Sequence, residues 1–167
     1  MIRKAEAKDH AQLLALYKAV ARIPDGIART PDEVTDDYIS GFMRKAAADG
    51  IEFVYEEEGT IGGEIHASRV GVAALSHLLT DLTIAVAPAC QGKGVGRALF
   101  GALLAEVSER MPHITRVELF ARESNVKARA LYASLGFVEE GRLRGRVRNA
   151  RGEIEDDALM GWIRPGP

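Results

Sequence analysis

A glycine-rich loop between an expected strand and an expected helix is the segment that most clearly suggests chemistry. Glycine lets the main chain adopt a positive φ and approach a ligand closely. The first turn of a helix leaves N–H groups unpaired at the positive end of its dipole. Such a loop favours an anion, most often a phosphate. Its residues are Gln91, Gly92, Lys93, Gly94, Val95, Gly96 and Arg97.

Three interpretations of this loop compete: an ATP-binding P-loop, a dinucleotide-binding loop and a flexible connection without a ligand. The ATP-binding P-loop string G-x-x-x-x-G-K-[ST] is absent, and the glycine spacing differs from the G-x-G-x-x-G of dinucleotide-binding folds. The loop is therefore an anion site of another kind, or a flexible connection without a ligand. Cys90 precedes the helix, but no histidine lies near it in sequence, so we interpret it as an incidental small residue rather than a nucleophile.

A second segment places an amide and a phenol on one helix face. Asn125 and Tyr132 are seven residues apart, which is two helical turns or about 10 Å along the axis. Ala128 lies between them and leaves that face shallow, so that a narrow ligand could lie there. Taken alone, a core tyrosine with a locally satisfied hydroxyl is the simpler interpretation.

Strand and helix patterns alternate along the chain and predict an α/β (α+β) domain with one central sheet. Leu13, Leu16, Tyr17 and Val20 have helical spacing, and a capping box at Thr30 to Glu33 predicts a second helix carrying Val34 and Phe42. The other predicted strands are 2–5, 51–57, 61–72, a strand through 82–86 and 116–121, with helices at 94–110 and 124–135 and a C-terminal hairpin turning at 149–152.

Composition narrows the function classes. The 167 residues are 47% apolar and 28% charged with a net charge of −2, which predicts one globular domain over 1–167 and no nucleic-acid partner. No apolar run reaches the roughly 20 residues of a membrane span, and the start lacks a signal peptide. The single cysteine suits a reducing compartment. The four histidines lack metal-ligand spacing. We expect a cytoplasmic protein without a metal or a membrane partner.

The two segments together resemble the GNAT superfamily of N-acetyltransferases. The resemblance rests on Gln91-x-x-Gly94-x-Gly96 followed by Asn125-x-x-Ala128-x-x-x-Tyr132 and then Gly136-Phe137, each after an expected strand. It implies a mixed, mostly antiparallel sheet flanked by helices, with two central strands splaying apart. It also implies acetyl-CoA as cofactor, and a homodimer would be usual.

The same resemblance assigns roles to residues. The main chain of Gln91 to Arg97 would hold the CoA diphosphate, and the strand end at Ile84, Ala85 and Val86 would pair with the pantetheine arm and the acetyl carbonyl. Asn125 and Ala128 would adjoin the cofactor arm, and Tyr132 would sit beside the thioester sulfur. Proton transfer from a phenol with a pKa near 10 to the thiolate of a thiol with a pKa near 8.5 is unfavourable by roughly 2 kcal/mol. Tyr132 would therefore act mainly as a hydrogen-bond donor.

The implied reaction is direct attack of an amine on the thioester, and the amine must first lose a proton. Asp81 and Glu64 are the catalytic candidates for this step, with His66 on the same strand face as Glu64; His77 and Glu118 are further candidates. Each could instead be an ordinary sheet-face or surface residue, and water could relay the proton.

Alternating arginines in the tail predict a charge ladder. Four arginines from Arg142 to Arg148 occupy every second position, and Glu153, Glu155 and Asp157 follow with the same period. A turn at 149–152 would place Arg148 opposite Glu153, Arg146 opposite Glu155 and Arg144 opposite Asp157. Arg142 would then face Leu159 and remain free for a substrate carboxylate.

The tail is similar to that of bacterial family members acting on amino acids, polyamines or protein N-termini. We expect a small amine such as a free amino acid, in a pocket walled by the first two helices, their loop with Arg22 and Arg29, and the hairpin. The alternatives are a protein N-terminal or polyamine acetyltransferase, an enzyme for longer acyl chains, and a non-catalytic acyl-CoA sensor.

Overall fold

A seven-stranded sheet forms the centre of the molecule, in the order β1-β2-β3-β4-β5-β7-β6. The computed structural model describes residues 1–166. The strands are β1 (Ile2–Lys4), β2 (Gly50–Glu57), β3 (Thr60–Ser68), β4 (Leu78–Val86), β5 (Arg116–Arg122), β6 (Val138–Arg148) and β7 (Ile154–Ile163). The α-helices of this part of the chain are α1 (His10–Ala21), α2 (Asp36–Asp49), α3 (Val95–Arg110) and α4 (Val126–Ser134).

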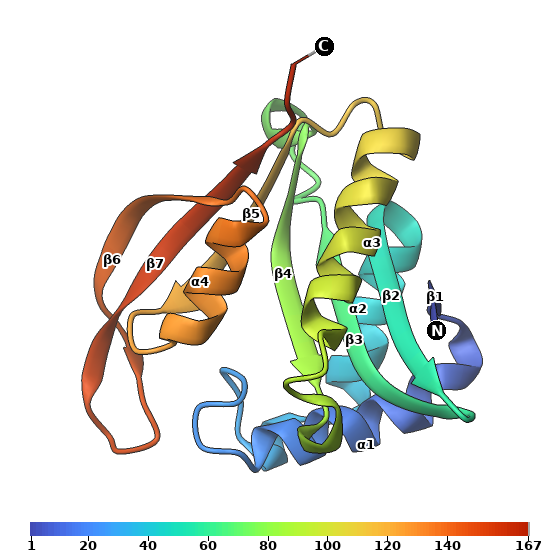
Figure 1. The fold of residues 1–167 in the computed structure, drawn as a ribbon, viewed down its shortest axis with the longest axis vertical. Helices are drawn as coiled ribbons and strands as arrows, with labels where there is room; N and C mark the ends of the chain where they lie inside the picture. Colours follow the sequence, from blue (N-terminus) through green and yellow to red (C-terminus); the bar gives the residue numbers. More distant parts are fainter. Residues whose placement is uncertain (167) are drawn as a thin grey trace.

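Neighbouring strands are antiparallel except at the centre, where β4 and β5 run parallel. These two strands pair only through Leu78 with Arg116 and Leu79 with Val117. Beyond these pairs they diverge, as Figure 1 shows. The mixed, mostly antiparallel sheet with two splayed central strands is therefore confirmed.

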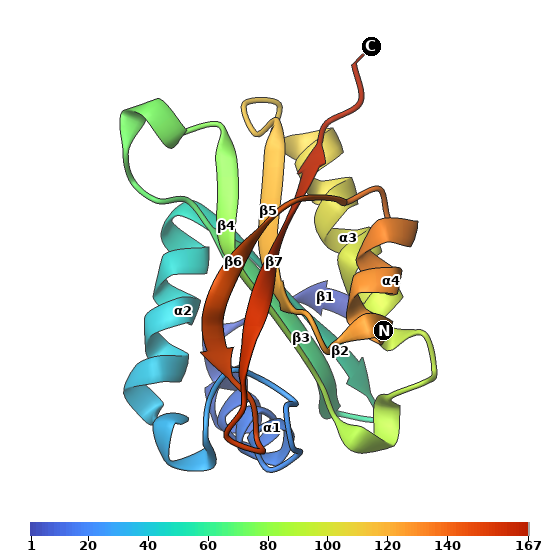
Figure 2. The same ribbon diagram turned by 90° about the vertical axis from the view of Figure 1, so that its left-hand side faces the viewer.

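Helices cover both faces of the sheet, with α1 and α2 on one side and α3 and α4 on the other (Figure 2). Each side has its own apolar core. Leu13, Tyr17 and Ile39 are fully buried under α1 and α2, and Leu99 and Phe100 are fully buried beneath α3. The buried positions of α1 have the spacing predicted from the sequence.

The second helix begins later than predicted. The capping box at Thr30 and Glu33 forms, but it closes only a single 3-10 turn. Val34 then leaves the helical region with φ −87° and ψ 89° and is buried in the core under α1. A new cap, Thr35, accepts a hydrogen bond from the Tyr38 N–H at 3.1 Å and starts α2. The third predicted strand likewise ends at Ser68 rather than at residue 72.

The register of the C-terminal hairpin differs from the prediction. Arg148 lies opposite Ile154, and Arg142 lies opposite Ala158 rather than Leu159. The turn is one residue longer than predicted, because the Asn149 N–H donates to the carbonyl oxygen of Glu153 at 2.9 Å. A bulge between Leu143 and Val147 shifts the register again.

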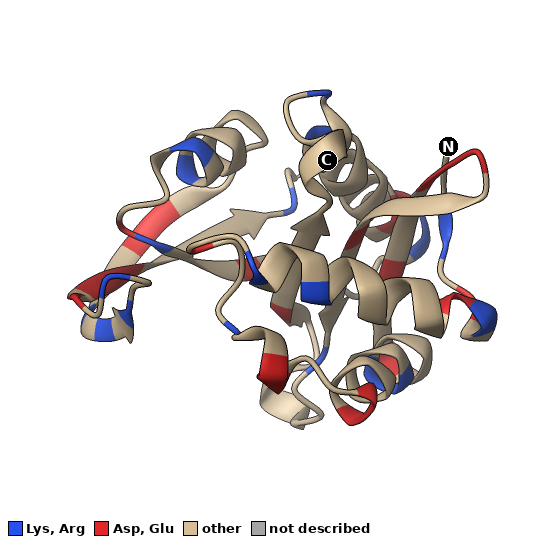
Figure 3. Cartoon of the chain, turned by 90° about the horizontal axis from the view of Figure 1, so that it is seen from below, with Lys and Arg blue, Asp and Glu red and all other residues tan. Residues whose placement is uncertain are grey.

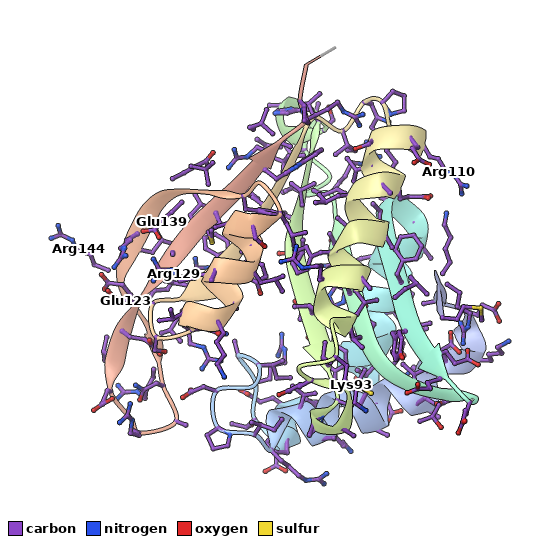
Figure 4. The ribbon with its side chains drawn as sticks, viewed as in Figure 1. Lys93, Arg110, Glu123, Arg129, Glu139 and Arg144 are labelled. Atoms are coloured by element: carbon purple, nitrogen blue, oxygen red, sulfur yellow. The ribbon has the colours of Figure 1, made fainter. Side chains whose placement is uncertain are left out.

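The predicted charge ladder is therefore wrong in its pairs. Arg146 lies 3.8 Å from Asp157, and Arg142 bonds Glu139 at 2.7 Å and Glu123 at 2.5 Å. Arg142 is thus already paired and is not the free cation that the sequence predicted. Arg144 points away from the molecule (Figure 4) and makes no ion pair within residues 1–166.

Basic and acidic positions are interspersed over the same elements when the molecule is viewed from below (Figure 3). Across residues 1–166, no helix is both long enough and apolar enough to cross a bilayer.

Candidate active site

A cavity of about 720 Å³ lies where β4 and β5 diverge. Its walls come from the loop after α1, from α2, from β3, β4 and β5, from α4 with its N-cap, and from the hairpin. The side chains with functional groups in these walls include Arg29, Tyr38, Lys45, His66, Asp81, Arg122, Asn125, Tyr132, Arg146 and Asp157. The volume is typical of a small-molecule site.

The glycine loop leaves a row of main-chain donors at the start of α3. Gly92 and Gly94 have φ of +73° and +82°, and Gly94 occupies the N-cap position without a side-chain cap. Within residues 1–166, the N–H groups of residues 92–97 donate to no protein oxygen. Lys93 lies in this loop (Figure 4). The arrangement fits an anion such as a diphosphate, because uncapped donors and the helix dipole point the same way.

The end of β4 offers a free main-chain edge. The Ala87 N–H bonds the Gly62 carbonyl at 2.9 Å, and Ala85 lies opposite Glu64. Main-chain N–H and C=O groups alternate in direction along an antiparallel strand. Those of Ala85 therefore point toward β3, whereas those of Ile84 and Val86 point toward the side on which β5 diverges. The Gln91 amide donates to the Val86 carbonyl at 3.0 Å, so this side chain braces the loop.

Asn125 and Tyr132 both line the cavity, although they reach it differently from the prediction. Asn125 is the N-cap of α4 rather than a residue within it, and its Oδ1 accepts from the Ala128 N–H at 3.2 Å. Tyr132 packs against Phe100 and Phe137 with ring centroids 5.1 and 6.2 Å away. Its hydroxyl bonds no group within residues 1–166, and burial raises the pKa of Tyr132 to about 12.

The two predicted carboxylates have different environments. Asp81 lies within β4, not at its start, with φ +51° beside a register shift, and its carboxylate is 3.6 Å from Lys45. Glu64 is completely buried and does not line the cavity. Its Oε1 lies 3.0 Å from Nδ1 of His66, which does line the cavity. The other candidate bases, His77 and Glu118, lie outside the cavity walls.

Asp25 makes two contacts beside the cavity that were not predicted from the sequence. Its carboxylate accepts from Arg122 Nη1 at 2.5 Å and from the Ala150 N–H at 2.9 Å. These bonds tie the loop after α1 to β5 and to the hairpin turn. The Ile23-Pro24-Asp25-Gly26 segment interrupts the helical pattern, but nothing local in it pointed to these partners. Arg29 lines the cavity as predicted, whereas Arg22 does not.

Cys90 packs beside Gly62, where an added Cβ would lie 2.5 Å from its sulfur. Within residues 1–166, no three His, Cys, Asp or Glu side chains are grouped to hold a metal ion.

Comparison with known protein families matches residues 13–137 to the acetyltransferase (GNAT) family. That match covers well over half of the chain. The chain belongs to the GNAT family. The predicted resemblance is confirmed, and the fold and family are those of an N-acetyltransferase.

Solved structures of other GNAT proteins superpose on nearly the whole chain. A ribosomal-protein-alanine N-acetyltransferase from Brucella melitensis is 25% identical, with a TM-score of 0.85 over 98% of this chain and 99% of that one. A GNAT acetyltransferase from Streptococcus pneumoniae is 25% identical, with a TM-score of 0.81 and 98% of both chains covered. The yncA protein of Salmonella typhimurium, solved with its cofactor acetyl-CoA, is 21% identical with a TM-score of 0.85, covering 100% of this chain and 95% of that one.

Proposed function

We propose that this GNAT protein transfers an acetyl group from acetyl-CoA to the primary amine of a small molecule, with amino acids as the favoured class. The observation that carries the proposal is the cavity at the β4–β5 divergence, which brings a tyrosine hydroxyl together with charged side chains, while the uncapped main-chain donors lie at the start of α3, after the same strand. Family membership supplies the acetyl donor.

The described residues fit this cofactor. The N–H groups of residues 92–97 would hold the diphosphate, and the free edge of β4 at Ile84 and Val86 would pair with the pantetheine amides. Asn125 and Ala128 would border the arm. The bound cofactor supplies an acetyl group activated as a thioester.

The chain's own groups would then act on the acetyl carbonyl and on the sulfur. A free N–H on the β4 edge would donate to the carbonyl oxygen as negative charge develops there. Tyr132 would donate its hydroxyl hydrogen to the departing sulfur, since this hydroxyl has no protein acceptor within residues 1–166. The amine must arrive unprotonated, because an ammonium has no lone pair.

The cavity favours an acceptor that carries a carboxylate. Arg122, Arg146 and Lys45 each face an acidic partner. Arg29 instead lies over the ring of Tyr38 at 4.0 Å and has no ion pair within residues 1–166. A guanidinium already stacked on an aromatic ring is suited to a bidentate contact with a carboxylate.

A protein N-terminus is the second candidate, because the Brucella relative is a ribosomal-protein-alanine N-acetyltransferase. The Asp25 contacts to Arg122, a residue of the cavity wall, and to Ala150 favour the smaller acceptor, since they hold the loop after α1 against β5 and the hairpin turn.

Two measurements test the proposal. Acetyl-CoA at 100 times its Kd should stabilise the protein by about 2.7 kcal/mol. Thiol release should then be followed with amino acids, with the same amines lacking the carboxylate, and with short peptides. Arg29→Met should raise KM at least tenfold for amino acids and little for decarboxylated amines. Arg144→Met, on the outward-pointing arginine, is the matched control. Peptides as the best acceptors would support the second candidate, and no turnover of any amine would refute the proposal.

A further inference from the structure

A buried polar cluster lies under the cavity on the α1–α2 side of the sheet. Glu64 and His66 are two residues apart on β3, so their side chains share one face. Tyr17 reaches them from α1, with its hydroxyl 2.5 Å from Glu64 Oε2. None of these side chains is more than 7% exposed. The acetyl-transfer chemistry described above uses none of them.

The hydrogen bonds of Glu64 determine how the histidine is protonated. A buried carboxylate is strongly unfavourable unless it accepts hydrogen bonds. Burial and the charge of Glu64 raise the pKa of Tyr17 well above its ordinary value, so this phenol stays protonated and donates to Oε2. Oε1 is then the acceptor for an Nδ1–H of His66, at 3.0 Å. That tautomer leaves the lone pair on Nε2.

The ring of His66 is held in place and its free nitrogen belongs to the cavity wall. The imidazole stacks on Phe42 with centroids 4.1 Å apart and planes 8° apart. Nε2 has no protein partner within residues 1–166, and His66 lines the same cavity as Ile84 and Tyr132.

We propose that His66 is the catalytic base, taking the proton of the acceptor amine on Nε2, and that Glu64 is a positioning residue that fixes its tautomer. The proposal rests on the proposed function and adds to it the group that activates the acceptor. It reassigns the predicted role of Glu64, which is too deeply buried to meet a substrate.

The proton step balances without another reagent. An N–H bond of the ammonium breaks, its electron pair stays on nitrogen as the lone pair that attacks the acetyl carbon, and the proton forms an imidazolium beside the Glu64 carboxylate. The imidazolium later returns the proton to water in the cavity. Ordinary imidazole lies about one to one and a half pKa units below the α-amine of a peptide and about four below a lysine. The α-amine of a free amino acid lies between these two, so it suits this base better than a lysine does.

Asp81 is the competing candidate. It lines the cavity, but it is exposed and its carboxylate faces the ammonium of Lys45 at 3.6 Å. The Asp81 side chain is therefore not held toward a substrate in the way that Glu64 and Phe42 hold the His66 ring.

The pH dependence of the reaction involves every ionisable group around His66. Glu64 and Tyr17 contact it, and Glu52 lies directly opposite on β2. Burial, reinforced by the charge of Glu64, raises the pKa of Glu52 to about 8, so Glu52 could titrate in the same range. The groups of α2, β4 and the preceding loop that share the cavity are Asp37, Tyr38, Lys45, Asp81 and Arg29. A variant at Glu52 is therefore the necessary control.

The test compares two acceptors with wild-type protein and His66→Gln. One is the best α-amine found in the thiol-release screen, and the other is methoxyamine, which is already unprotonated at neutral pH. His66→Gln should lower kcat/KM about 100- to 1000-fold for the α-amine and less than tenfold for methoxyamine. Its Kd for acetyl-CoA should stay within twofold. An equal loss for both acceptors, or no loss, overturns the assignment.

Glu64→Gln tests the positioning role. It should lower the α-amine rate about tenfold or more and move the acid-side fall in activity to lower pH, since the imidazolium loses its carboxylate. Glu52→Gln should leave that profile in place. The positioning role of Glu64 is overturned if Glu64→Gln leaves the pH profile of kcat/KM unchanged, or if Glu52→Gln shifts that profile.

If the His66 variant does not fold, the wild-type profile decides. The reactive pair is the neutral imidazole and the ammonium, so log kcat/KM for the α-amine should fall with a slope of one, and only at pH values well below the pKa of the free amine, whereas methoxyamine should show almost no slope. An acid-side fall that begins at the pKa of the free α-amine overturns the proposal for His66. If the wild-type protein turns over no amine, the proposed function itself fails. If it is active and His66→Gln remains fully active, only this inference fails.

Discussion

Replacing Tyr132 with phenylalanine isolates a single hydroxyl at the candidate thioester site. The ring packs between Phe100 and Phe137, and the substitution keeps those contacts. The hydroxyl forms no hydrogen bond within residues 1–166, so the free energy of unfolding should change by less than about 0.5 kcal/mol. A change in rate would then report on the chemistry and not on folding.

The size of the effect follows from the pKa of the phenol. Burial raises that pKa to about 12, whereas an alkyl thiol titrates near 8.5. Complete proton transfer from Tyr132 to a thiolate is therefore uphill by about 5 kcal/mol, more than twice the value expected from the sequence. A hydrogen bond to the charged sulfur is worth about 1.5–3 kcal/mol. Its loss predicts a fall in kcat of about 10- to 150-fold.

Steady-state thiol release measures kcat, and calorimetry measures the Kd for acetyl-CoA. The Kd for acetyl-CoA should change less than threefold, because the hydroxyl interacts mainly with charge that develops on the sulfur. An unchanged kcat under conditions where single-turnover data show chemistry to be rate-limiting would refute the reasoning. A large loss of cofactor affinity with kcat preserved would refute it as well, since the tyrosine would then only bind.

Three further predictions concern the loop, the fold and a buried acid. Gly94→Ala forces φ +82° on an L-residue at a cost of about 1–2 kcal/mol and should weaken acetyl-CoA binding in calorimetry, whereas Gly101→Ala on the open face of α3 should not. Arg164 donates to four carbonyl oxygens in the last turn of α3 and just after it, those of Val107, Ser108, Met111 and Ile114. Arg164→Ala should therefore lower the free energy of unfolding by about 2 kcal/mol in urea denaturation, and an unchanged midpoint would contradict this. Glu52 has a pKa of about 8 in the folded state, above its ordinary 4.5, so the protein loses stability as pH rises from about 4.5 to 8. Glu52→Gln should flatten that decline. Parallel plots of unfolding free energy against pH for the wild type and the variant would contradict this.

The elements that the sequence predicted well are those with local causes. The period of α1, the left-handed glycines before α3 and the capping box at Thr30 each depend on residues within one or two turns of one another. The capping box also shows the limit of local evidence. It formed as predicted, but burial of Val34 in the core under α1 ended the helical turn, and only tertiary packing could decide that.

The hairpin register failed for a similar reason. A turn of four residues and a turn of five fit the same pattern of alternating charges, and the difference shifts every cross-strand pair. The bulge near Gly145, with φ +60° and an N–H bonded to Asp156 at 2.8 Å, then shifts the register in the opposite direction and past the predicted pairing, so that Arg142 lies opposite Ala158. Arg142 thereby meets Glu123, which follows β5 and whose N–H donates to the Asp156 carbonyl oxygen of β7 at 3.0 Å.

The sequence predicted several residues of the candidate site, but not how deeply each is buried or which distant residues it contacts. Period-two reasoning placed Glu64 and His66 on one face of a strand. Their roles differ because Tyr17, which is 47 residues away from Glu64 in sequence, donates a hydrogen bond to the buried Glu64 carboxylate. Asp25 and Arg122 are 97 residues apart, and no local pattern could have paired them.

The short pairing of β4 with β5 explains how groups on opposite faces of the sheet can act on one substrate. His66 lies on the α1–α2 side and Tyr132 on the α3–α4 side, so an unbroken sheet would separate them. Parallel strands need a crossover connection, and here α3 supplies it. The helix must therefore start at the carboxyl end of β4, where the strands have already diverged. The same topology thus opens the passage through the sheet and places uncapped N–H groups beside it.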